Sequence, residues 1–216
     1  MRVDVVNQIG AVIRQVRIAE RDGKEAKVVV ATQTFATTPD DLWSAITEPE
    51  RLQRWFSPVS GDLRLGGRYQ IEGNASGTIT SCEPERRLAM TWECGGDVSW
   101  LEVRLTAEGG EGTRLDLEHT ALPGDHWKEF GPGATGVGWD LTLLGLEQYT
   151  SVGKTLDLTA WPASEAGKDF IRRSSDDWCR AAIASGADPT HAAAAAARTA
   201  AFYTGDGGSA DVPGSR

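Results

Sequence analysis

The sequence has few cysteines and few basic residues, and each shortage excludes a class of protein. The three cysteines, Cys82, Cys94 and Cys179, are widely spaced and form no CxxC pair, so neither a disulfide framework nor a metal site is predicted. The 22 Lys and Arg residues stand against 31 Asp and Glu residues, which gives a net charge of -9. Such an acidic surface repels phosphate backbones and anionic lipids. We therefore expect no nucleic-acid partner and a reducing, cytoplasmic location.

Long apolar runs are also missing. No uninterrupted apolar stretch approaches the roughly 20 residues that span a bilayer, so we expect no membrane partner. What the sequence does contain is tryptophan, which accounts for eight of its sixteen aromatic residues. Tryptophan usually lies in cores, pockets or interfaces. The question is therefore what these side chains surround.

The two ends of the chain are expected to be helical. Val5, Ile9, Val12 and Val16 recur at helical spacing, which predicts an amphipathic N-terminal helix over residues 1–20. A helical extension is predicted over residues 161–204. The segment 205–216 has few apolar residues and is expected to be a disordered tail.

The central part, residues 27–152, has the pattern of one α+β domain. Residues 27–35 are rich in Val and Thr, which predicts a strand, and the segments that begin at Pro39 and Pro49 predict two short helices. From residue 61 to 121 the apolar period is two, with regularly spaced turn signals, which is typical of an antiparallel meander. Its predicted strands are 62–65, 68–72, 77–83, 87–93, 99–106 and 113–121.

One face of this predicted sheet is apolar and needs a cover. The opposite face carries charged residues such as Glu102 and Arg104, which must meet water. A helix over residues 137–152 presents Trp139, Leu143 and Leu146 on one stripe. We therefore predict a curved antiparallel sheet wrapped around a long helix, with extra helices at both ends of the chain.

Several short strings carry a family resemblance. They are Thr47-Glu48-Pro49-Glu50 with Trp55-Phe56, the run from Gly61 to Tyr69, Gly77-Thr78-Ile79, Cys82-Glu83-Pro84, the run from Leu88 to Trp92, the run from Gly112 to Leu115, and Gly138-Trp139. As a set, and in this order of elements, they resemble the START-like, birch-pollen-allergen-like (SRPBCC) superfamily. The branch is similar to the C-terminal domain of the heat-shock-protein-90 ATPase activator. The resemblance covers residues 27–152 and implies a helix-grip fold with an interior cavity, which in related proteins holds apolar or amphipathic small molecules.

The candidate ligand site combines this expected cavity with strand parity. The residues predicted to line it are Trp55, Tyr69, Met90, Trp92, Leu117, His119, Trp139, Leu143 and Leu146. Trp127 and Phe130 lie in the segment after the last strand, where they could form a lid or plug the cavity. A solid core made of the same aromatic side chains remains an open alternative.

Three functions follow as hypotheses. The first is binding of a small hydrophobic or amphipathic molecule, without a metal or a cofactor. The second is an enzyme similar to the cyclases and aromatases of this superfamily, with His119 as general base and Tyr69 as acid or orienting donor. The alternative for His119 is a hydrogen-bonded core residue, which is the commoner state of a buried histidine. The third is a co-chaperone-like interaction module that uses the outer sheet face around Trp100; a homodimer is a further alternative for that face.

Overall fold

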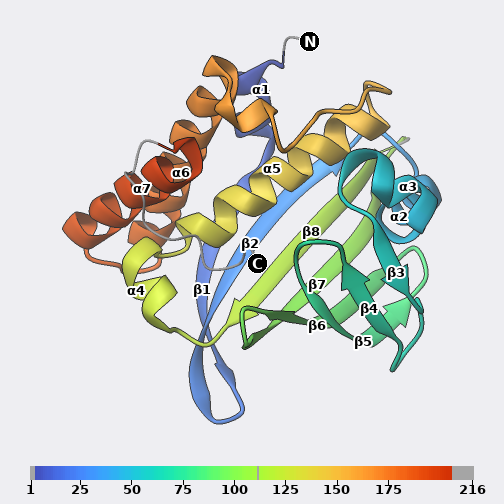
Figure 1. Cartoon of the computed structure of the whole chain (residues 1–216), viewed down its shortest axis with the longest axis horizontal. Coiled ribbons are helices and arrows are strands. Elements are labelled where there is room, and N and C mark those ends of the chain that lie inside the picture. The colour runs from blue at the N-terminus through green and yellow to red at the C-terminus, as the bar shows by residue number, and fades with distance from the viewer. Residues whose placement is uncertain (1–2, 111, 206–216) are drawn as a thin grey trace. The chain divides into compact units, whose positions relative to one another are not determined.

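The computed structural model describes residues 3–110 and 112–205 and shows an α+β fold, as predicted. Eight strands form one curved antiparallel sheet in the order β1-β2-β8-β7-β6-β5-β4-β3 (Figure 1). The strands are β1 (Ile13–Arg21), β2 (Lys24–Phe35), β3 (Val59–Gly61), β4 (Arg68–Ile71), β5 (Ser76–Glu83), β6 (Arg87–Cys94), β7 (Asp97–Glu108) and β8 (Gly112–Ala121).

Seven α-helices are found in these described residues. They are α1 (Val5–Ala11), α2 (Pro39–Thr47), α3 (Pro49–Trp55), α4 (Asp125–Phe130), α5 (Gly133–Thr150), α6 (Glu165–Ala184) and α7 (Pro189–Thr204), with one short 3-10 helix, η1 (Trp161–Ala163). The two short helices predicted after the first core strand are α2 and α3. Proline stands at the first position of both, where its missing N–H costs nothing.

The chain divides into two compact units. Unit 1 holds the described residues up to 31, together with 122–144 and 157–205, and unit 2 holds 32–121 without residue 111, together with 145–156. The boundary passes through β2 and through α5. Unit 2 therefore contains the meander and the last turns of α5, whereas unit 1 contains the first and the last of the described residues.

The predicted N-terminal helix over residues 1–20 is wrong beyond Ala11. The carboxylate of Asp4 caps α1 by accepting a hydrogen bond from the Asn7 amide at 3.1 Å, but Val12 is already extended, with φ -98° and ψ 122°. The residues that follow form β1 instead. Ile13 and Ile18 are β-branched, and such side chains suit a pleated strand better than a helix. Residues 1 and 2 lie outside the described part.

The meander of unit 2 has the predicted faces. In β7, the inward residues Leu101, Val103 and Leu105 are buried, whereas Arg104 between them is exposed. One predicted strand is misplaced, because residues 62–65 belong to no strand and β3 lies before them at Val59–Gly61. Gly61 has φ 125°, which ends the strand there.

In unit 1, α6 and α7 lie side by side near the C-terminal end of the described chain (Figure 1). Ser164 and Asp188 cap their N-termini with side-chain oxygens, and Gly205 ends α7 with a left-handed φ of 73°. The tail predicted to be disordered falls almost entirely on residues 206–216, which lie outside the described part. Among the helices that the structure describes, none is long and apolar enough to cross a membrane.

Candidate functional site

The apolar face of the sheet in unit 2 brings three of the predicted ligand-binding residues together. Met90 of β6 pairs with Leu101 of β7, which pairs in turn with His119 of β8. Leu117 lies two residues before His119 on the same face. All four side chains are at least nine-tenths buried. The structure therefore places His119 in an otherwise apolar row of the sheet.

His119 is held by a hydrogen-bond chain at the edge of this row. Its Nε2 atom lies 2.8 Å from the Ser99 hydroxyl, which itself donates to the Trp92 carbonyl at 3.2 Å. A hydroxyl has one proton to give, so with that proton on the Trp92 carbonyl the Nε2 atom donates to Ser99. The indole of Trp92 meets the imidazole edge-on, with ring centroids 5.9 Å apart.

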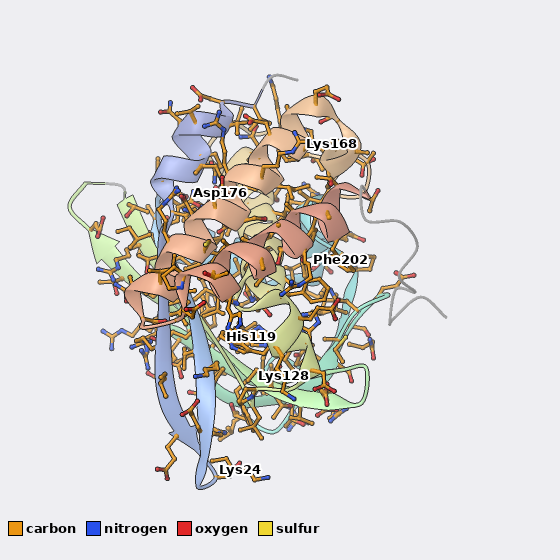
Figure 2. The ribbon with its side chains drawn as sticks, turned by 90° about the vertical axis from the view of Figure 1, so that its left-hand side faces the viewer. Lys24, His119, Lys128, Lys168, Asp176 and Phe202 are labelled. Carbon is orange, nitrogen blue, oxygen red and sulfur yellow. The ribbon has the colours of Figure 1, made fainter. Side chains whose placement is uncertain are left out.

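Burial lowers the pKa of His119 from its ordinary 6.5 to about 4. Removing the ring from water penalises the charged imidazolium more than the neutral ring. At neutral pH the site therefore contains a polar but uncharged group (labelled in Figure 2).

The inward face of the sheet keeps partial contact with solvent next to His119. Trp92 and Ser99 pair across β6 and β7 and share the inward face of the sheet, yet both are only half-buried. Met90 and Leu101, one pair further into the sheet, are 8% and 5% exposed. An inward tryptophan that keeps contact with water beside a buried imidazole is the arrangement expected at the rim of a binding site.

Two other predicted residues of unit 2 are committed to structural contacts. The Trp55 indole donates to the Ala45 carbonyl at 3.0 Å and so ties α3 to α2. The Tyr69 hydroxyl donates to the Thr91 carbonyl at 2.8 Å, and burial raises the pKa of this phenol. The proton of Tyr69 is therefore already used within the sheet, which argues against its predicted role as acid or orienting donor.

The residues predicted on the long helix fall in both units. Leu146 belongs to unit 2, whereas Trp139 and Leu143 belong to unit 1. All three are at least nine-tenths buried. Their part in a ligand site stays a prediction. Among the described residues, no group of three or more His, Cys, Asp or Glu side chains comes together to hold a metal ion.

Comparison with known proteins identifies the family. The family model described as "Activator of Hsp90 ATPase homolog 1-like protein" matches residues 36–151, which is more than half of the chain. The chain belongs to this family. The match contains α2, α3, the meander, α4 and the whole of α5. The segments before and after it are additions to this activator-homologue domain.

Two proteins illustrate the relationship at the level of sequence. CalU16 from Micromonospora echinospora is 32% identical, with 82% of this chain and 99% of CalU16 covered and a TM-score of 0.65 for its crystal structure. Its solution structure gives a TM-score of 0.68. The activator of 90 kDa heat shock protein ATPase homolog 1 from Mus musculus is 27% identical over 101 residues, which are 44% of this chain and 30% of the mouse protein. The chain thus matches less than a third of that relative's length.

A more distant structure shares the fold alone. EF2215 from Enterococcus faecalis is 15% identical, with a TM-score of 0.60 over 81% of this chain and 92% of that protein.

The additions to the activator-homologue domain build a buried ionic cluster in unit 1 that the sequence did not predict. Asp140 of α5 is fully buried, and its Oδ2 atom accepts from Arg14 Nε at 2.9 Å, from Trp178 Nε1 at 3.0 Å and from the Ser174 hydroxyl. Arg14 also donates through Nη1 to Asp177 at 2.9 Å. Every one of these partners of Asp140 lies outside the residues that match the family model.

The surroundings of the cluster are tightly packed. Burial raises the pKa of Asp140, against the opposing effects of Arg14, Ser174 and Trp178. A Cβ atom on Gly136, one turn before Asp140, would lie 2.2 Å from the Trp178 ring, so only glycine lets the helices approach this closely. A cavity beside Trp178 has a volume of about 10 Å³, which is room for one water molecule at most. We conclude that this cluster joins β1 and α6 to α5 rather than binding a ligand.

The predicted lid residues lie on α4, a helix where a loop was expected. Trp127 and Phe130 are half-buried. The Phe130 ring packs at a tilt against Phe202 of α7, with a centroid distance of 5.5 Å, and Arg198 donates to the Glu129 carbonyl at 2.7 Å (Phe202 is labelled in Figure 2). The C-terminal end of α4 is therefore anchored to α7, and a function as a lid stays a prediction.

Proposed function

We propose that this chain binds a small apolar or amphipathic molecule against the apolar face of its sheet, at the rim formed by Trp92, Ser99 and His119. The observation that carries the proposal is the combination at this rim of a half-buried inward tryptophan and a nine-tenths buried imidazole. The hydrogen bond to Ser99 offsets the cost of burying the His119 ring among Leu and Met side chains. In a ligand pocket, apolar walls remove the ligand from water, and a few polar groups such as this imidazole fix its orientation.

Binding is better supported than acid–base catalysis. A general base works best when its pKa lies near the working pH, whereas burial lowers the pKa of His119 to about 4. Tyr69, the second candidate for proton transfer, already donates to the Thr91 carbonyl. The histidine therefore suits the recognition of a ligand better than proton abstraction.

The relatives are consistent with more than one role. The mouse relative is named for activation of the 90 kDa heat shock protein ATPase, but its matched part is only 30% of its length. CalU16, in contrast, is covered almost completely. We therefore base the proposal on the site rather than on the name of a relative, and we treat capture of a chaperone as evidence for a different function.

Native mass spectrometry of gently purified protein tests the proposal. We expect a discrete mass increment on the 23.2 kDa chain that disappears under denaturing conditions and is reduced in Trp92→Ala. The control is Trp100→Ala, because Trp100 is equally half-buried but faces the opposite side of β7. An increment that both variants retain would place the bound molecule elsewhere.

A further inference from the structure

We infer that the end of the ligand that reaches His119 is uncharged, so that the site takes neutral amphipathic molecules such as alcohols or phenols and rejects carboxylates and phosphates. The inference rests on the proposed function and names its ligand class. It depends on where the cationic side chains of unit 2 lie and on the hydrogen-bond chain at His119.

The four arginines on the described strands of unit 2 all lie on the outer face of the sheet. Arg104 alternates with the buried Val103 and Leu105, and the other three likewise occupy outward positions of their strands. Each of them is paired with an acidic residue there. The pairs are Arg68 with Glu93 at 3.1 Å, Arg87 with Glu102 at 2.8 Å, Arg114 with Asp116 at 2.8 Å, and Arg104 with Glu102.

The remaining cations of unit 2 lie outside the strands of the sheet. Arg51 binds Asp41 at 2.7 Å and lies over the Tyr149 ring. The others are exposed and belong to α3, to turns or to the segment after α5; they are Arg54, Arg64, Arg86 and Lys154. Within the part of unit 2 that the structure describes, no lysine or arginine therefore stands on the inward face of the sheet.

The polar groups at the rim do not replace a cation. The Ser99 proton goes to the Trp92 carbonyl, and the Nε2 proton of His119 goes to Ser99. An anion buried beside this neutral pair would lose its hydration without gaining a counter-charge, which costs far more than burying a hydroxyl. The net charge of -9 adds a repulsive field for any approaching anion.

The test compares two probes that differ in charge and share one apolar body. At neutral pH, 1-pyrenemethanol is uncharged and 1-pyrenecarboxylate is an anion. We expect the wild-type protein to bind the alcohol at least about tenfold more tightly, which corresponds to about 1.4 kcal/mol. The measurement is a fluorescence titration of each probe with the full chain.

A charge placed at the rim should change this preference. Ser99 is half-buried, so a Ser99→Lys side chain can keep its ammonium group near water while it reaches the ligand. We expect this variant to shift the ratio of the two dissociation constants by about tenfold towards the carboxylate. The control is Val98→Lys, which adds the same charge to the opposite face at a residue that is 49% exposed, and which should leave the ratio unchanged.

The outcomes separate the two proposals. Equal or tighter binding of the carboxylate by the wild type overturns the uncharged-ligand inference and leaves the proposed function in place. A shift of equal size in Val98→Lys overturns the inference as well, because the effect would then come from net charge. If neither probe binds and native mass spectrometry finds an empty chain, the proposed function fails and the inference falls with it.

Discussion

Replacing Arg14 with methionine is expected to lower the free energy of unfolding by about 3–5 kcal/mol. The variant keeps the length of the apolar stem but removes the cation from Asp140, which is fully buried. A buried carboxylate without its counter-charge loses the Coulombic attraction and still bears the full cost of desolvation. Urea denaturation followed by circular dichroism measures the loss.

Two further variants show that the effect belongs to the buried pair. Arg17→Met removes an exposed arginine from the same strand and should change the stability by no more than about 0.5 kcal/mol. The double variant Arg14→Met with Asp140→Asn should recover most of the loss, because asparagine can still accept from Ser174 and Trp178 without carrying charge. A decrease of less than about 1 kcal/mol in the free energy of unfolding of Arg14→Met would contradict a stabilising role of the buried ion pair.

The second large effect concerns pH. Because burial lowers the pKa of His119 from 6.5 to about 4, the unfolded chain binds this proton more tightly than the folded chain does. The contribution of His119 to stability is therefore complete above about pH 6.5 and is lost as the pH falls through about 4. Each pKa unit corresponds to about 1.4 kcal/mol, so the loss attributable to His119 is about 3 kcal/mol.

Denaturation curves recorded between pH 7 and pH 4 isolate this contribution. Carboxylates titrate in the same window, so the quantity to compare is the slope of stability against pH in the wild type and in His119→Gln. The glutamine variant should have the shallower slope. His191→Gln serves as control, because the side chain of His191 is 91% exposed; it should retain the wild-type slope. Identical slopes in all three proteins would contradict a buried neutral His119.

The faces of the sheet could be predicted from the sequence because they depend on a local pattern, the alternation of apolar and polar residues along each strand. Alternation along β7 placed Leu101 and Val103 inward and Arg104 outward, and the burial of these residues agrees. The same parity placed Met90, Leu117 and His119 on one face, where strand pairing indeed brings them. A strand with one buried face carries its orientation in every second residue.

The N-terminal segment shows where local patterns fail. Val12 and Val16 are four residues apart, which is the spacing of one helix face. Ile13 and Val16 are also β-branched, however, and β-branched side chains favour a strand. The β1 strand forms because its backbone can pair with β2 at the edge of the sheet. Pairing with a distant segment overrides a weak local preference.

The ionic cluster of unit 1 depends entirely on contacts that are distant in sequence. Arg14 and Asp140 are separated by 126 residues, and Arg14 and Asp177 by 163. Asp140 did carry a signal, because it is an acidic residue on a helix that is otherwise largely apolar. Its partners could not be named without the fold. Tyr69 was assigned a role as proton donor for the same reason, because the partner of its hydroxyl is a backbone carbonyl 22 residues away, which the sequence does not reveal.

Tryptophan fluorescence during a titration with 1-pyrenemethanol tests the central claim most directly, because Trp92 would form part of the binding site. We expect saturable quenching of the wild-type emission. We also expect Trp92→Phe to lose a large share of this change, whereas Trp100→Phe, altered on the opposite face of the sheet, should keep it. No saturable change in the wild type, or an equal loss in both variants, would contradict binding at the rim formed by Trp92, Ser99 and His119.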